Sequence, residues 1–110
     1  MCEKNKKNSC VVYVRSASDS NWYGLMEQAY EACKFANDTS LYISDVFIDH
    51  GTKGNTMNRP ALQKMLSRIA NNPVEYVVVR DISRLSREIV DYMKLCNKFS
   101  NLGVTLITLR

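Results

Sequence analysis

The sequence contains little glycine, proline, histidine or tryptophan. Its 110 residues include four glycines, two prolines, one histidine and one tryptophan. No glycine-rich turn follows the first apolar run, which disfavours a nucleotide-binding fold that cradles phosphate in such a turn. No apolar run approaches the length that crosses a bilayer, and the polar, lysine-rich start does not resemble a secretory signal. The sequence therefore predicts no membrane association.

Cysteine is present, but its positions suggest neither a disulfide framework nor a metal site. The four cysteines are far apart, without zinc-ligand or redox-motif spacing: Cys2, Cys10, Cys33 and Cys96. We expect free thiols in the reducing cytoplasm. The histidine, His50, follows Asp49, but neighbours on a strand face opposite sides, so the pair does not predict a metal site.

The composition indicates a single folded domain. Hydrophobic residues make up 45% of the chain and charged residues 24%, which is typical of globular proteins. A chain of this length has room for one core. The formal net charge of +4 permits an anionic partner without identifying one.

Short, β-branched apolar runs alternate with amphipathic segments from residue 10 onward. Runs of this kind predict strands that are buried on both faces, as in parallel sheets. Strands are predicted at 10–15, 41–49, 74–79 and 104–109, and helices at 23–37, 60–70 and from within 80–87 to about 102. This order predicts an α/β fold with three αβα layers and a mostly parallel sheet of four to five strands. Residues 1–9 are expected to form a disordered basic lead-in, and 10–110 the domain.

Helical spacing selects the apolar side chains that are expected to face the core. In the last helix the predicted stripe is Leu85, Ile89, Tyr92 or Met93, Cys96 and Phe99. Met26, Met65 and Met93 are interpreted as core filling, and Cys33 as a buried thiol.

Polar and charged residues follow each of the first three predicted strands. The carboxyl ends of parallel strands lie at one edge of the sheet, where such folds bind ligands. Guanidiniums offer planar forks of donors that suit a phosphate or a carboxylate. We therefore expect a phosphate site built from the cations near this edge: Arg15, Lys53, Arg59, Arg80, Arg84 and Arg87.

The spacing of the last two arginines strengthens this expectation. Arg84 and Arg87 are three residues apart, so on a helix they would project from one face. The alternative is a solvent-exposed first turn in which they pair with neighbouring acids: Asp81, Glu88 and Asp91.

Four short segments form an ordered set of motifs. Tyr13-Val14-Arg15 precedes small residues, and residues 25–28 read Leu-Met-Glu-Gln. After Asp49 and a glycine loop, residues 58–63 read Asn-Arg-Pro-Ala-Leu-Gln, and residues 83–87 read Ser-Arg-Leu-Ser-Arg. This set resembles the Tyr-x-Arg-x-Ser, Leu-x-x-Gln, Asp…Gly…Arg-Pro-x-Leu-Gln and Asp-Arg-Leu-Ser-Arg motifs of the serine recombinases. The resemblance covers residues 10–110 and favours the large, mobile-element subgroup of transposon and phage integrases.

The resemblance implies the catalytic domain of a site-specific recombinase that cuts and rejoins double-stranded DNA. In this family a serine hydroxyl attacks a phosphodiester, a 5′-phosphoserine forms and a 3′-hydroxyl leaves, without a metal or nucleotide cofactor. Guanidiniums must then stabilise the charge that develops on the phosphoryl oxygens. By resemblance, Arg15, Arg84 and Arg87 would hold the scissile phosphate, and Arg59 would contact it or support its neighbours.

The resemblance also implies positioning residues around this phosphate site. Tyr13, Gln28 and Asp49 would position the arginines and the nucleophile loop. Arg80 and Lys53 are further candidates for phosphate contacts.

One position departs from the family motif. The nucleophilic serine of the family falls on Ala17, which has no hydroxyl. Three interpretations stay open: the domain is inactive, a shifted loop lets Ser16 or Ser18 attack, or Ala17 replaces a serine of the natural protein. A shift of one residue moves a hydroxyl by about 3.8 Å along the chain, whereas in-line attack tolerates about 1 Å, which disfavours rescue by a neighbour.

Family members continue into a dimerisation helix and a DNA-binding region, which these 110 residues lack. We expect the N-terminal catalytic domain of a longer protein that forms homodimers and synaptic tetramers on DNA. Two alternatives stay open. Ala17 favours a catalytically inactive, recombinase-like binding or regulatory module. Asp49 suggests a phospho-acceptor signalling domain, but such domains carry acids where this chain has Arg15.

Overall fold

The structure is a computed structural model that describes residues 7–16, 22–51 and 59–110. Its strands and helices alternate almost as the sequence predicts, with strand ends shifted by one or two residues. In chain order they are β1 (Ser9–Ser16), α1 (Trp22–Asp38), β2 (Tyr42–His50), α2 (Pro60–Asn71), β3 (Tyr76–Val79), α3 (Ile82–Leu85), α4 (Ile89–Asn101) and β4 (Thr105–Thr108).

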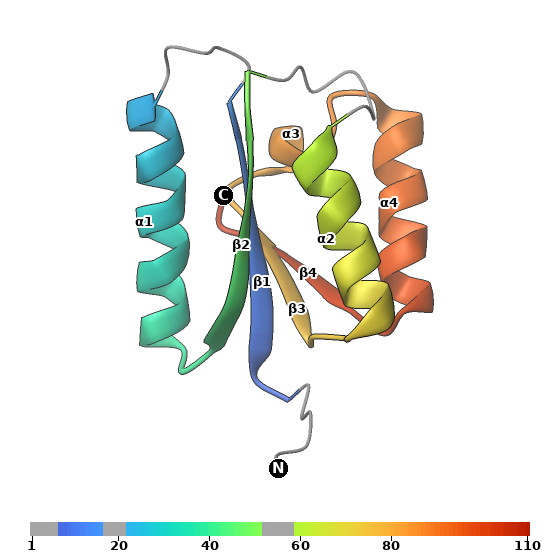
Figure 1. Ribbon diagram of the computed structural model, residues 1–110, viewed down its shortest axis with the longest axis horizontal. Helices are drawn as coiled ribbons and strands as arrows, with labels where there is room; N and C mark the ends of the chain where they lie inside the picture. The colour runs from blue at the N-terminus through green and yellow to red at the C-terminus, as the bar shows by residue number, and fades with distance from the viewer. Residues whose placement is uncertain (1–6, 17–21, 52–58) are drawn as a thin grey trace.

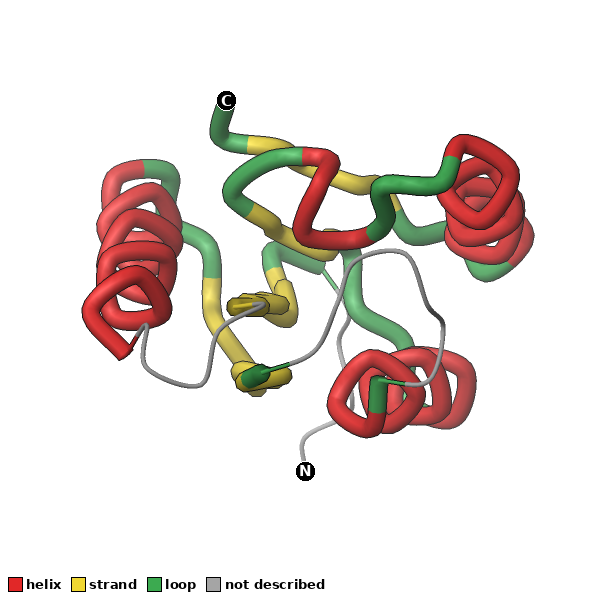
Figure 2. Tube along the Cα trace, turned by 90° about the horizontal axis from the view of Figure 1, so that it is seen from above, coloured by secondary structure: helices red, strands yellow, loops and turns green. Residues whose placement is uncertain are grey.

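The four described strands form one sheet in the order β2-β1-β3-β4, and every pair is parallel. Helix α1 lies alone on one face of this sheet, and α2 and α4 cover the other (Figures 1 and 2). The predicted three-layer α/β fold is therefore confirmed. All strands run the same way, so their carboxyl ends meet at one edge of the sheet.

Strand β1 lies at the centre of this arrangement. All eight of its residues are buried, because β2 and β3 flank it and helices cover both of its faces. Val11 and Tyr13 enter the core under α2 and α4, whereas Cys10, Val12 and Val14 enter the core under α1. The nearly continuous apolar run in the sequence thus reflects burial on both sides.

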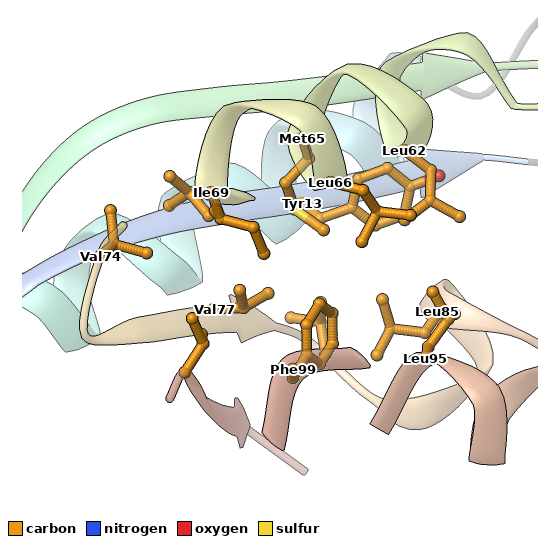
Figure 3. Close-up of a cluster of buried hydrophobic side chains, with 13 residues drawn as sticks. Tyr13, Leu62, Met65, Leu66, Ile69, Val74, Val77, Leu85, Leu95 and Phe99 are labelled. Carbon is orange, nitrogen blue, oxygen red and sulfur yellow. The ribbon is translucent and has the colours of Figure 1, made fainter. Parts of the chain in front are cut away.

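The larger of the two cores lies between α2, α4 and the sheet. Figure 3 shows Leu62, Met65 and Ile69 of α2 pointing toward Leu95 and Phe99 of α4, in one core on the same face of the sheet. The amphipathic spacing of α2 predicted this buried face, and all three of its residues are fully buried.

The prediction of one long helix near residues 82–102 is wrong. Helix α3 ends at Leu85, Ser86 is extended, and α4 begins at Ile89. The Ser86 hydroxyl accepts a hydrogen bond of 3.0 Å from the backbone N–H of Glu88, which replaces a helical bond with a local turn.

The first turns of α4 do not keep the predicted buried stripe. Ile89 and Met93 are 73% and 59% exposed, although the predicted stripe buries them, whereas Phe99 is buried as predicted and Leu95, which the stripe leaves out, is buried too. A stripe extrapolated from Leu85 assumes unbroken helical phase, and residues 86–88 do not preserve that phase.

Two predicted core residues of α1 are also exposed. Met26 is 67% exposed and Cys33 is an exposed thiol. The buried stripe of α1 is Leu25, Gln28, Ala32 and Ala36, and the other two residues lie beside it. Cys10, Cys33 and Cys96 are free, as expected, and burial raises the pKa of Cys10 to about 11. None of the helices in the described ranges is long and apolar enough to span a bilayer.

Helix α3 has one residue that anchors it and one that does not, which allows a matched test. Leu85 is fully buried in the large core, whereas Ile82 is 46% exposed. We expect Leu85→Ala to lower the free energy of unfolding by about 2–5 kcal/mol and Ile82→Ala by less than about 1 kcal/mol. Urea titration followed by circular dichroism measures both. Equal losses would show that α3 is not anchored through Leu85.

Candidate functional site

The structure brings several predicted site residues together at the carboxyl edge of the sheet. Arg15 and Asp49 are the last residues but one of β1 and β2, and they are paired in register. Arg59 directly precedes α2, and Arg84 lies in α3. Arg15 and Arg59 are fully buried, and Asp49 is 3% exposed. Buried charges need partners, so each contact in this cluster bears on its stability.

Asp49 connects three elements through one carboxylate. Its Oδ2 accepts a hydrogen bond of 2.6 Å from the Tyr13 hydroxyl and one of 3.0 Å from the N–H of Leu62. Its Oδ1 accepts one of 2.9 Å from the N–H of Ala61. Pro60 has no N–H to offer, and the N-cap residue Arg59 makes no capping bond with its own side chain. A carboxylate from β2 therefore caps α2 and also suits the positive end of its dipole.

Tyr13 is held in its neutral form by this arrangement. Burial raises the pKa of its phenol well above the usual range, and the hydrogen bond to Asp49 raises it further. The Arg59 guanidinium lies 5.8 Å from the centre of the Tyr13 ring, within cation–π range. Tyr13 thus contacts both Asp49 and Arg59, and its predicted positioning role stays a prediction.

Gln28 fixes the end of β1 from the opposite face of the sheet. Its side-chain Oε1 accepts from the Arg15 N–H at 3.2 Å, and its Nε2 donates to the Arg15 carbonyl at 2.9 Å. Gln28 is buried among the apolar residues of α1, where its amide would be costly without these bonds. The predicted positioning role of Gln28 therefore has a specific geometry in the structure.

The guanidiniums of Arg15 and Arg59 bind the backbone carbonyls of α3. Arg15 Nε and Nη2 donate to the carbonyls of Arg84 and Ser83 at 3.2 and 2.8 Å. Arg59 Nη1 donates to the Arg84 carbonyl at 2.9 Å, and its Nη2 donates to the Leu85 carbonyl. A continuing helix would use these carbonyls for N–H groups four residues later. The two buried arginines therefore explain why α3 stops after one turn.

Positive charge is concentrated where these residues meet. Burial lowers the pKa of Arg15 below its usual value, and the charge of Arg59 lowers it further, followed by Arg84 and Arg87. The side chain of Arg84 is 22% exposed, and its Nη1 donates to the Arg15 carbonyl at 3.3 Å. Such a cluster lowers the cost of bringing an anion to this edge.

Asp81 begins α3 and lies beside Arg84. Its Oδ1 accepts from the N–H of Ser83 at 3.1 Å and from the Ser83 hydroxyl, which makes it the N-cap of α3. Its Oδ2 is 3.7 Å from Arg84 Nε. Burial raises the pKa of Asp81, but the bonds from Ser83 and the charge of Arg84 outweigh it, so the pKa lies below its usual value.

Arg80 and Arg87 are placed differently from the sequence prediction. Arg80 points to the α1 side of the sheet, where its Nε is 3.5 Å from Glu31. Glu31 also accepts a hydrogen bond of 2.6 Å from Arg110, and nothing in the sequence pattern marked it. Arg87 is exposed between α3 and α4, so it does not share a helical face with Arg84. Among the residues that the structure describes, the accessible positive charge at this edge therefore comes from Arg84 and Arg87.

The predicted nucleophile loop is mostly outside the described residues, because Ala17 and Ser18 are not among them. The predicted phosphate-contact candidate Lys53, in the glycine loop after β2, also lies outside them. Ser16 is described and is 1% exposed at the end of β1. Because strand neighbours alternate, its side chain lies on the opposite sheet face from that of Arg15. In the described ranges, no cluster of three histidine, cysteine or acidic residues could hold a metal.

The contacts of Arg59 lead to a test of how α3 is held. Arg59→Lys keeps the charge but cannot bridge two carbonyls with a planar fork. We expect a loss of about 2–3 kcal/mol in the free energy of unfolding, because buried carbonyls lose charged donors. Arg68→Lys in α2, where the arginine is partly exposed beside Asp45, is the control and should cost less than about 1 kcal/mol. Urea unfolding compares the two, and a cost no larger than that of the control would contradict the assignment.

The raised pKa of Tyr13 leads to a test of pH dependence. The folded protein holds the phenol proton more tightly than the unfolded chain does, so this stabilisation is complete below about pH 10 and is lost as the pH rises further. Tyr13→Phe should remove that loss, at roughly 1 kcal/mol per pH unit between about pH 10 and 11. Urea unfolding at pH 8 and 11 measures it. Tyr42→Phe, at an exposed tyrosine of β2, should follow the unmodified protein.

Solved structures with the same fold include catalytic domains of serine recombinases. The N-terminal catalytic domain of TP901-1 integrase superposes with a TM-score of 0.86 at 27% identity, covering 92% of this chain and 77% of that one. A serine recombinase from Sulfolobus solfataricus gives 0.75 at 26% identity, covering 92% and 67%. The C-terminal catalytic domain of ISC1926 TnpA, an IS607-like serine recombinase, gives 0.87 over 93% of this chain and 67% of that one. At 22% identity this last match shows the fold alone.

The sequence comparison agrees with the structural one. No curated protein matches the chain in sequence. Residues 10–110 match the family described as Resolvase, N terminal domain, which is nearly the whole chain and includes every site residue described above. The chain belongs to the resolvase family and has the fold of the catalytic domain of serine recombinases.

Proposed function

We propose that this domain cuts and rejoins double-stranded DNA in a site-specific recombinase, through a 5′-phosphoserine intermediate. The observation that carries the proposal is the cluster of Arg15, Arg59 and Arg84 at the carboxyl edge of the sheet, in a chain of the resolvase family. In the proposed reaction a serine oxygen bonds to phosphorus, the bond to the 3′ oxygen breaks, and that oxygen takes a proton. Attack by the 3′-hydroxyl reverses these steps and releases the serine.

The arginines have two different roles in this proposal. Arg84 and Arg87 are accessible enough to contact the phosphate, and fixed positive charge near the phosphoryl oxygens stabilises the transition state without a metal. Arg15 and Arg59 act through α3, because their donors hold its carbonyls and so set the position of Arg84. Arg80, tied to Glu31 on the other face, supports the fold and not the phosphate.

The residue at the nucleophile position argues against catalytic activity of this sequence. Ala17 has no hydroxyl, and the burial of Ser16 on the sheet face away from the arginines argues against Ser16 as a substitute. A second candidate function is therefore an inactive recombinase-like domain that binds DNA or an active partner, which Ala17 favours. In either case we propose that the longer protein acts in the cytoplasm on DNA as a homodimer that assembles into a tetramer.

A covalent adduct distinguishes the two candidates. The longer protein that carries this domain is incubated with its recombination site, and the products are separated on a denaturing gel. We expect no protein–DNA adduct with Ala17 and a clear adduct with Ala17→Ser. Adding Arg84→Gln to Ala17→Ser should reduce the adduct by about 100-fold or more. Adding Arg68→Gln, at the far end of α2, should leave it unchanged.

Other outcomes have definite meanings. An adduct that forms with Ala17 and disappears with Ser18→Ala would show that the loop is shifted and the chain is active. DNA binding without an adduct in every variant would contradict the catalytic proposal and leave the inactive module. An adduct that tolerates Arg84→Gln would show that the arginine cluster is not the phosphate site.

A further inference from the structure

Two aromatic rings from different elements meet at the carboxyl edge of the sheet. The ring of Trp22, the first residue of α1, lies against the ring of His50, the last residue of β2. Their centroids are 3.7 Å apart, and the rings are tilted by 40°. Figure 1 shows the start of α1 and the end of β2 at the same edge of the sheet. Neither ring belongs to the arginine cluster, and the sequence motifs do not include them.

The ring of His50 is held by packing and not by a hydrogen bond at Nε2. This atom is buried and has no hydrogen-bond partner within the part of the chain that the structure describes. His50 follows Asp49, whose side chain binds Tyr13, so the His50 side chain lies on the other side of the sheet, toward α1. A buried ring nitrogen without a partner is costly. Close packing against Trp22 offsets part of that cost.

The first turn of α1 has few other buried contacts among the described residues. Its first buried side chain is Leu25, three residues after Trp22. Tyr23 is 73% exposed, and Gly24 has a low helix propensity. Helix ends that are held by few buried contacts open readily. The ring contact with His50 therefore stabilises a turn that would otherwise fray.

The end of β2 also holds the residue on the other side of the nucleophile position. Ser16 directly precedes Ala17, and its carbonyl accepts a hydrogen bond of 2.7 Å from the N–H of Gly51. Ser16 and Trp22, the described residues on either side of residues 17–21, are therefore both bound to the end of β2. Fixing both ends of a short segment restricts the conformations that are open to it.

Resting on the function proposed above, we propose that Trp22 and His50 are positioning residues for the nucleophile. Asp49 and His50 are neighbours in β2 with side chains on opposite sides of the sheet. Asp49 caps α2, which Arg59 precedes, and His50 holds the start of α1. The end of β2 thus links the arginine cluster to both flanks of position 17. A hydroxyl there must attack the phosphate in line, and a displacement of about 1 Å can cost about 100-fold in rate.

The ring contact can be measured without DNA, because Trp22 is the only tryptophan of the chain. His50→Ala should shift the Trp22 emission to longer wavelength and increase its quenching by acrylamide, whereas His50→Phe should change both much less. Conversely, Trp22→Ala should lower the protection of the Gly51 N–H against hydrogen exchange by about tenfold or more, because the end of β2 would open more often. Tyr30→Ala, at a 69% exposed ring further along α1, is the control and should change neither measurement.

The consequence for the reaction is measured in the longer protein that carries Ala17→Ser, as the rate of adduct formation on its recombination site. Adding His50→Ala should lower this rate by about tenfold or more, and adding His50→Phe should keep it within about threefold. The affinity for DNA should not change, because the rings lie outside the arginine cluster. Rescue by an aromatic ring at constant DNA affinity separates positioning from loss of folding, which circular dichroism also checks.

Several results would overturn this role. Unchanged Trp22 emission in His50→Ala, or unchanged protection of Gly51 in Trp22→Ala, would show that the rings do not hold the end of β2. A His50→Phe variant that is as slow as His50→Ala would show that the ring is not what matters. A normal adduct that His50→Ala leaves unchanged would overturn the positioning role alone. No adduct from Ala17→Ser by itself would instead contradict the proposed function, and the positioning role with it.

Discussion

The hydrogen bonds from two buried guanidiniums to the carbonyls of α3 are the interaction on which the site depends. Arg15 and Arg59 come from different elements, yet both donate to the Arg84 carbonyl. Their bonds end α3 after one turn, and the break in turn sets the phase of α4 against the core. Buried charges without partners would destabilise the domain, but here each charge satisfies backbone acceptors that the helix end leaves open. The same contacts thus offset the cost of burying two charges and the cost of leaving the carbonyls at the end of α3 unpaired.

The scaffold around these arginines is held by a single carboxylate. Asp49 binds Tyr13 of β1 and the first free N–H groups of α2, so it fixes where Arg59 enters the site. Apolar packing stabilises the same elements from below, through side chains such as Leu62 and Leu85. Through the chain of contacts from Tyr13 to α3, residues that lie away from Arg84 still determine where Arg84 lies. Such supporting contacts are typical of rigid functional sites.

The two faces of the sheet carry different groups of residues. The face under α2 and α4 carries the arginine cluster, because Tyr13 and Arg15 point to that side. The face under α1 carries Gln28, the ion pairs of Glu31 and an apolar surface that extends onto the edge strand β2. A sheet covered by two helices on one side and one on the other leaves a strand face open.

The sequence by itself determined the order of strands and helices, the parallel sheet and the family, because apolar periodicity and ordered motifs are local properties of the chain. It also identified Arg15, Arg59, Arg84 and Asp49 as neighbours, since strand ends converge at one edge. Only the tertiary structure decided that α3 stops at Leu85, because the donors that end it come from residues 25–70 positions earlier. The same holds for Arg80, whose partner Glu31 comes from α1, 49 residues earlier in the chain. Long-range contacts of this kind leave no periodic signal in the sequence.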